Sequence, residues 1–199
     1  MKGRSLRLAA WQPHARAVRA PKSMHDWLVT PGSLTARLVA NSETFRVRRL
    51  HQRSAPCLMD EAAAIGLTRA QRAWEREVLL ECDGAPVVFG HTVVPMDCDA
   101  TDWPLFSALG ERSLGTTLFY DPLVRRGQLE FARLSADHPL VRRAHAALGR
   151  QVQARNSNTN IYYARRCVYR RRQGLLLVTE VFLPAVLELG AAATMKNIL

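Results

Sequence analysis

An arginine begins one face of an apolar strand pattern in the segment 74–95, which reads WEREVLLECDGAPVVFGHTVVP. Side chains two apart share a face of a strand, so Arg76 shares its face with apolar residues only, while Glu77 and Glu81 lie on the other face, where we expect water. The pattern therefore predicts a guanidinium that points toward the core. Such a group needs a partner, because burying an unpaired charge is costly.

A carboxylate has similar surroundings near the C-terminus. Glu180 lies in the apolar run 175–183 and has almost no polar neighbours on its strand. Two interpretations fit both charges. Arg76 and Glu180 could form a buried ion pair with each other. Alternatively, they could line a closed pocket and contact opposite ends of one ligand, with the arginine holding a carboxylate and the glutamate accepting from a hydroxyl.

A Leu-Gly step at Leu114 and Gly115 precedes an expected strand over 114–119. Glycine lets a backbone approach another group closely, so the N–H of Leu114 could donate to the same ligand carboxylate. A simple tight turn explains the same pattern.

The elements that must position these residues follow from periodicity and turn residues. We expect a short helix, a turn at Pro31 and Gly32, a second helix capped by Ser33, and a hairpin that turns at Asp83 and Gly84. The other expected elements are a strand over 44–52, a helix-rich segment over 59–75 with a break at Gly66, a short helix over 100–110, a strand over 127–135, a helix within 138–153, and a hairpin over 160–184 that turns within YRRRQG. Helices and strands do not alternate regularly, which predicts an α+β fold with a single antiparallel sheet of about six strands and helices packed on it.

Length and composition limit the functions that this chain could have. The 199 residues suit one domain, 1–199, in which we expect 1–22 to be a loosely held lead-in and 185–199 a tail without a clear role. No apolar run is long enough to span a membrane, and the N-terminus does not resemble a secretory signal. The cysteines and histidines lack metal-ligand or disulfide spacing, so we expect no metal, no disulfide and a reducing compartment. The net charge of +11 is spread over short arginine pairs, which argues against a nucleic-acid-binding module, the basic alternative.

Several blocks resemble those of the chorismate pyruvate-lyase family, bacterial enzymes that make 4-hydroxybenzoate for ubiquinone. The segments WEREVLLECDGAPVVFGHTVVP, SLGTTLF and LLLVTEVFLPAV are similar to three signature blocks of that family, and DWLVTPGSLTARL and ARRCVYRRRQG are similar to two more. The resemblance covers about residues 26–184. It implies an α+β fold whose helices form flaps over a buried ligand site, and a cofactor-free cytoplasmic enzyme that converts chorismate to 4-hydroxybenzoate and pyruvate. We expect a monomer without nucleic-acid partners or stable membrane insertion.

The resemblance also implies site residues. Arg76 matches the arginine that holds the ring carboxylate, Leu114 the residue whose backbone N–H assists it, and Glu180 the carboxylate near the ring hydroxyl. Leu34 matches a flap position that is Met in the best-known member. His91 matches an arginine there, which could assist passage of the ligand. A non-catalytic domain of the same fold that binds an aromatic acid is the alternative.

Overall fold

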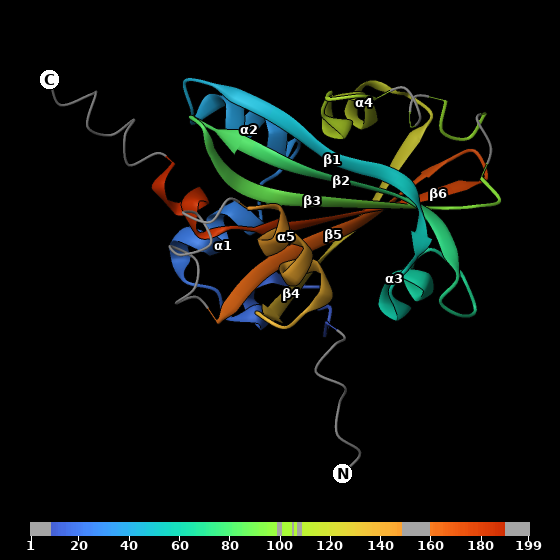
Figure 1. Cartoon of the computed structure of the whole chain (residues 1–199), viewed down its shortest axis with the longest axis horizontal. Helices are drawn as coiled ribbons and strands as arrows, with labels where there is room; N and C mark the ends of the chain where they lie inside the picture. Colours follow the sequence, from blue (N-terminus) through green and yellow to red (C-terminus); the bar gives the residue numbers. More distant parts are fainter. Residues whose placement is uncertain (1–8, 99–100, 105, 107–108, 149–159, 190–199) are drawn as a thin grey trace, which may run out of the picture.

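A single antiparallel sheet organises the molecule (Figure 1). The computed structural model describes residues 9–98, 101–104, 106, 109–148 and 160–189. The six strands are hydrogen-bonded in the order β1-β2-β3-β6-β5-β4. Their bounds are β1 Phe45–Pro56, β2 Arg72–Cys82, β3 Ala85–Pro95, β4 Val124–Ser135, β5 Ile161–Arg171 and β6 Gly174–Phe182. The expected α+β fold with one six-stranded antiparallel sheet is therefore confirmed.

Two hairpins supply four of the strands, as the turn residues predicted. Asp83 and Gly84 connect β2 to β3 with φ values of 50° and 79°. Such a two-residue turn with both φ angles positive suits an Asp-Gly pair and the twist of the strands. Asp83 also accepts hydrogen bonds from the N–H groups of Glu43 and Thr44, which joins the turn to the start of β1.

Short helices cover both faces of the sheet. On one face, α1 and α2 pack against apolar residues of β1 and β2, and α4 packs near β5 and β6. On the opposite face, α5 packs on the middle of the sheet and α3 near β3 and β6. Ser33 caps α2 as predicted, because its hydroxyl accepts from the N–H of Ala36. The helices are η1 Ala15–Val18, α1 Lys22–Leu28, α2 Leu34–Ala40, α3 Met59–Ala64, α4 Leu114–Tyr120, α5 Pro139–Ala147 and η2 Pro184–Glu188.

The segment 114–119 differs most clearly from the expected secondary structure. It is the helix α4 and not a strand. Leu114 and Leu118 are four residues apart and share one helical face, so both pack into the apolar cluster that contains Trp103 and Leu176. This tertiary contact outweighs the strand preference of the β-branched threonines in the segment.

Two further expected helices are shorter or absent. In the helix-rich segment 59–75, α3 ends at Ala64, Gly66 has a φ of 77°, and β2 begins at Arg72. Of the segment 100–110, the described residues form turns and no helix, with the N–H of Phe106 donating to the carbonyl of Trp103. Residues 100, 105, 107 and 108 lie outside the described part.

The chain near both termini packs more closely than expected. Gln12 and Phe131 of β4 exchange two backbone hydrogen bonds of 2.8 Å, and Val18 of η1 is buried. Near the C-terminus, η2 contacts β3 and buries Val186 completely. The description of 1–22 as loosely held is therefore wrong for residues 9–22, because their apolar side chains complete the core. Residues 1–8 and 190–199 lie outside the described part. No helix in the described ranges is both long and apolar enough to cross a membrane.

Candidate active site

A cavity lies between the sheet and the helices α2 and α4. It holds about 680 Å³ of empty space, including the part that opens to solvent. Its lining comes from the loop between α1 and α2, from α2 and α4, and from all six strands. Leu34, Arg76, Leu114 and Glu180, which sequence reasoning assigned to one site, all line this cavity.

Arg76 is buried at the β2 side of the cavity, with 2% of its surface exposed. Its Nη2 donates to the carbonyls of Gly110 and Arg112 at 3.1 and 3.0 Å. Its Nε is buried and has no hydrogen-bond partner among the described residues. Burial, with a contribution from the nearby charge of Arg49, lowers the pKa of Arg76 to about 10, so the group remains a cation at neutral pH. The structure thus holds a positive charge with unused hydrogen-bonding capacity against an enclosed space.

Glu180 is paired with Arg165 and not with Arg76. Arg165 Nε donates to the carboxylate of Glu180, and Arg165 Nη1 donates to the carbonyls of Leu28 and Thr30. Arg165 therefore connects Glu180 on β6 to the end of α1 and the start of the α1–α2 loop. Of the two interpretations of Arg76 and Glu180, the mutual ion pair does not form, and both side chains line one cavity.

The helices α2 and α4 meet at the edge of the cavity. The hydroxyls of Thr35 on α2 and Ser113 before α4 are hydrogen-bonded at 2.6 Å. Gly115 lies at this contact, since an added Cβ would lie 3.2 Å from Thr35 Oγ1. Leu114 is the first residue of α4, so its backbone N–H has no acceptor within its own helix.

A glycine on the floor of the cavity was missed by sequence reasoning. Gly90 on β3 pairs with Val78 on β2 and with Glu180 on β6. A Cβ at this position would lie only 2.9 Å from Val78 Cγ2. The absence of a side chain therefore leaves room beside Glu180. The signal in the sequence is a glycine inside an otherwise β-branched and aromatic strand, which marks a close approach.

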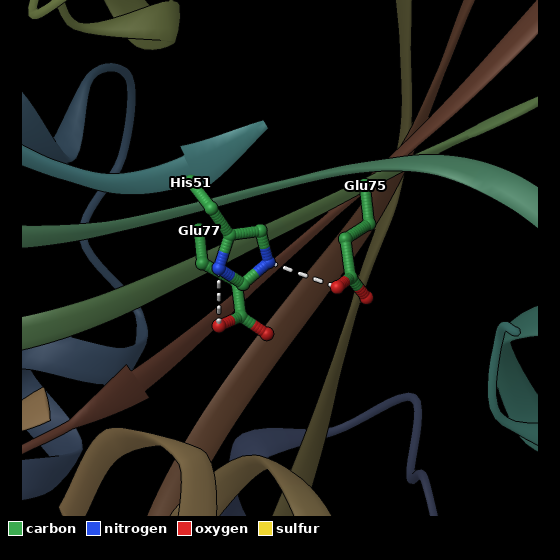
Figure 2. A group of neighbouring side chains, drawn as sticks. All are labelled: His51, Glu75 and Glu77. Atoms are coloured by element: carbon green, nitrogen blue, oxygen red, sulfur yellow. Dashed lines mark hydrogen bonds and ion pairs between the residues drawn. The ribbon is translucent and has the colours of Figure 1, made fainter. Parts of the chain in front are cut away.

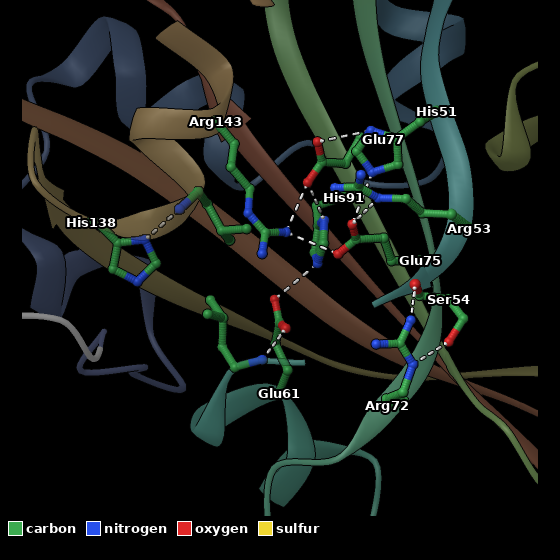
Figure 3. Close-up of polar contacts among 12 residues, drawn as sticks. His51, Arg53, Ser54, Glu61, Arg72, Glu75, Glu77, His91, His138 and Arg143 are labelled. Carbon is green, nitrogen blue, oxygen red and sulfur yellow. Dashed lines mark hydrogen bonds and ion pairs between the residues drawn. The ribbon is translucent and has the colours of Figure 1, made fainter. Parts of the chain in front are cut away.

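Figure 3 shows a cluster of charged residues between the sheet and the helices α3 and α5. None of the labelled residues of this cluster lines the cavity. Glu75 and Glu77 of β2 are buried there, at 2% and 4% exposure. Arg143 of α5 donates to both carboxylates at 2.9 Å. The expectation that Glu77 faces water is wrong, because α5 covers this face of β2 and supplies the compensating charge. Glu81 is partly exposed and pairs with Arg48 at 2.7 Å.

His51 of β1 lies beside the same two carboxylates (Figure 2). Its Nε2 is 2.9 Å from Glu75 and its Nδ1 is 3.7 Å from Glu77. The ligand atoms of these three residues lie within 4.8 Å of one another, a spacing that a metal ion could use. Arg143 already bridges the two carboxylates, and Arg53 lies 3.4 Å from Glu75, so cations of the chain itself compensate the charge of the two acids. We assign the group a structural role.

His91 belongs to this cluster and does not line the cavity. Its side chain lies between Glu61 of α3 and Glu77 of β2, at 3.1 and 3.2 Å (Figure 3). Burial alone would lower the pKa of His91, but the attraction of Glu61 and Glu77 outweighs it and raises the pKa to about 9. The same contacts hold the pKa of Glu77 below its usual range against the opposing effect of burial. His91 is thus a buried cation that points away from the ligand cavity.

The fold is a six-stranded antiparallel sheet whose cavity is lined by buried charged groups and closed on one side by α2 and α4. The sequence model of the family described as "Chorismate lyase" matches residues 5–189, and the chain belongs to this family. A relative from Ralstonia nicotianae, named probable chorismate pyruvate-lyase, is 52% identical over 160 residues, which cover 80% of each chain. A relative from Cupriavidus metallidurans with the same name is 47% identical over 184 residues, 92% of this chain and 84% of its own.

Among solved structures, PhnF from Mycobacterium smegmatis is similar with a TM-score of 0.55 at 15% identity, over 78% of this chain and 65% of that chain. The effector domain of the same protein gives a TM-score of 0.52 at 14% identity, over 77% and 89%. At these identities the likeness shows the fold alone.

Proposed function

We propose that this protein is a chorismate pyruvate-lyase, which converts chorismate to 4-hydroxybenzoate and pyruvate. The observation that carries the proposal is Arg76, a buried guanidinium that faces the cavity and has no carboxylate within 4 Å among the described residues. Burying a cation without an acid partner costs free energy, unless a ligand supplies the opposite charge. The names of the relatives supply the ligand, since each is a probable chorismate pyruvate-lyase.

The reaction needs little chemistry from the protein. The bond between ring carbon C3 and the ether oxygen breaks, and its electron pair goes to the oxygen. Ring carbon C4 loses its hydrogen as a proton, the ring becomes aromatic, and the enolpyruvate released takes a proton on its methylene carbon to become pyruvate. Aromatisation drives the reaction, so the enzyme's task is to orient the ring and to stabilise charge on the leaving group.

Arg76 and the backbone N–H of Leu114 bind the ring carboxylate in this proposal. Glu180, at the other side of the cavity, accepts a hydrogen bond from the C4 hydroxyl and assists removal of the C4 proton. Arg165 holds the Glu180 carboxylate in position through its Nε. The geometric support is that the groups line one cavity, with Glu180 beside Gly90, whose missing side chain leaves room for the ring.

The helices α2 and α4 act as flaps over the bound ring. Leu34 and Leu114 supply apolar surface to the cavity, and the hydrogen bond between Thr35 and Ser113 joins the two flaps. A closed lid would exclude water and strengthen the electrostatic contacts inside. From the family resemblance we infer that the reaction takes place in the bacterial cytoplasm and is the first step of ubiquinone biosynthesis.

The test is to mix the purified protein with chorismate, then measure pyruvate by a coupled reduction and 4-hydroxybenzoate by chromatography. Equal amounts of both products, formed in proportion to enzyme and above the rate without it, support the lyase. Binding of chorismate or 4-hydroxybenzoate without turnover would instead support a non-catalytic domain of the same fold.

A further inference from the structure

Among the residues that the structure describes, more cations than acids line the cavity. The charged lining residues of this part are three arginines, Arg76, Arg126 and Arg165, and one acid, Glu180, an excess of two positive charges. Chorismate carries two carboxylates, one on the ring and one on the enolpyruvyl group, whereas 4-hydroxybenzoate carries one. The excess charge therefore matches the substrate and exceeds what the aromatic product needs.

Two of the three arginines already have assignments. Arg76 meets the ring carboxylate in the proposed function. Arg165 is 2% exposed, and its Nε and Nη1 are used by Glu180 and by the carbonyls of Leu28 and Thr30. Arg126 is exposed and also lines the cavity, so its guanidinium lies where the cavity reaches solvent at the β4 edge of the sheet.

A local irregularity of β4 directs Arg126 toward the cavity. Arg126 pairs with Tyr169 of β5, and the register shifts between Arg126 and Leu129. Such a bulge bends the strand and re-aims a side chain. Gly127 permits it, because a Cβ there would lie 2.8 Å from the carbonyl oxygen of Val168.

Arg126 lies near Cys167, which faces the cavity two residues before Tyr169, and its positive charge opposes the rise in the pKa of the Cys167 thiol that burial causes. Cys167 in turn donates to the carbonyl of Gly127 at 3.3 Å. Arg126 thus lies at the solvent-facing edge of the cavity, beside Cys167 and Tyr169 of β5. In chorismate the enolpyruvyl ether is attached next to the C4 hydroxyl, so its carboxylate projects sideways from the ring near Glu180.

We propose that Arg126 binds the enolpyruvyl carboxylate of chorismate and stabilises the enolpyruvate as the ether bond breaks; this assignment rests on the proposed lyase function. Arg126 is then the residue that distinguishes substrate from product. Its contact exists with chorismate and in the transition state, and it is absent once 4-hydroxybenzoate alone occupies the site.

The experiment compares Arg126→Ala and Arg126→Lys with wild type. For each protein, kcat and KM for chorismate are measured by pyruvate release, and the Kd for 4-hydroxybenzoate by calorimetry. Arg125→Ala is the matched control, since Arg125 is the neighbouring exposed arginine of β4 and does not line the cavity. We expect kcat/KM to fall by about tenfold or more in Arg126→Ala. The lysine variant retains the charge but lacks the two-pronged geometry of a guanidinium. Its kcat/KM should therefore lie between those of wild type and Arg126→Ala.

The Kd for 4-hydroxybenzoate should stay within about twofold of wild type in both Arg126 variants, and Arg125→Ala should match wild type in both measurements. An unchanged kcat/KM in Arg126→Ala, or a parallel loss of substrate turnover and product binding, would overturn the assignment of Arg126. If the wild-type protein releases no pyruvate from chorismate, the lyase proposal itself fails. The wild-type measurement thus tests the lyase proposal separately from the assignment of Arg126.

Discussion

At the scale of single residues, the proposed mechanism assigns the ring carboxylate to Arg76. It is buried against the cavity and is neutralised by no acid of the described chain. Truncation to alanine should lower kcat/KM for chorismate by about a hundredfold or more, because losing a buried charged contact costs about 3 kcal/mol. Steady-state pyruvate release measures the effect, and circular dichroism checks the fold. Arg72→Ala is the control, since Arg72 is an exposed arginine of the same strand; equal activities of the two variants would remove Arg76 from the mechanism.

A substitution at Glu180 tests whether its carboxylate takes part in the reaction or only packs in the fold. Glu180→Gln keeps the shape of the side chain and removes the charge, so kcat should fall by about tenfold or more if the carboxylate assists proton removal. Glu130→Gln is a matched control, because Glu130 pairs with Arg166 as Glu180 pairs with Arg165, but does not line the cavity. Stopped assays of pyruvate release distinguish the two. Wild-type turnover in Glu180→Gln would leave Glu180 as a packing residue.

At the scale of elements, the hydrogen bond between Thr35 and Ser113 joins α2 to α4 over the cavity. Removing it with Thr35→Val or Ser113→Ala should weaken 4-hydroxybenzoate binding by roughly two- to tenfold, since one hydrogen bond contributes about 1 kcal/mol. Calorimetry on both single variants and the double variant completes a mutant cycle. The double variant should lose no more than either single variant, whereas additive losses would mean that the two hydroxyls act independently of each other.

The charged cluster opposite the cavity should make the stability of the fold depend on pH. His91 has a folded-state pKa of about 9, above its unfolded value near 6.5. Glu61 and Glu77 contact its ring, and Arg143 pairs with Glu77. A raised pKa stabilises the folded state fully below about pH 6.5 and loses that contribution as pH rises through about 9. The free energy of unfolding should therefore decrease over this window, by an amount on the order of a few kcal/mol.

Urea unfolding at pH 6.5, 8 and 9.5 measures this decrease. His91→Gln should be less stable than wild type at pH 6.5 and should show a flatter dependence on pH, because the titrating group is gone. A pH dependence identical in the two proteins would assign the effect to other groups.

At the scale of the whole molecule, a ligand bound in the cavity should stabilise the fold, because the cavity is formed by the loop between α1 and α2, two helices and all six strands. At a concentration 100 times its Kd, 4-hydroxybenzoate should stabilise the protein by about 2.7 kcal/mol. The melting temperature should rise by roughly 5 to 10 °C for a domain of this size. Differential scanning fluorimetry tests this, with phenol as the ligand that lacks the carboxylate. Arg76→Ala should show little rise with either compound; a full rise in that variant would place the ligand elsewhere.

Local patterns in the sequence determined much of this molecule. Alternation placed Arg76 on a buried face, an Asp-Gly pair set the hairpin of β2 and β3, and the apolar run around Glu180 marked a second buried charge. Each inference depends on residues within one element, where backbone geometry alone relates position to direction.

Tertiary structure decided the rest. It turned 114–119 into a helix by giving Leu114 and Leu118 an apolar cluster to join, and it buried Glu77 under Arg143, which is 66 residues away in the chain. It also paired Glu180 with Arg165 and left Arg76 facing the cavity. These outcomes depend on which distant segments meet, and no period or turn signal within one segment carries that information. The physical reason is that a charge or an apolar face is satisfied by any suitable partner, and only the assembled sheet brings one partner within reach.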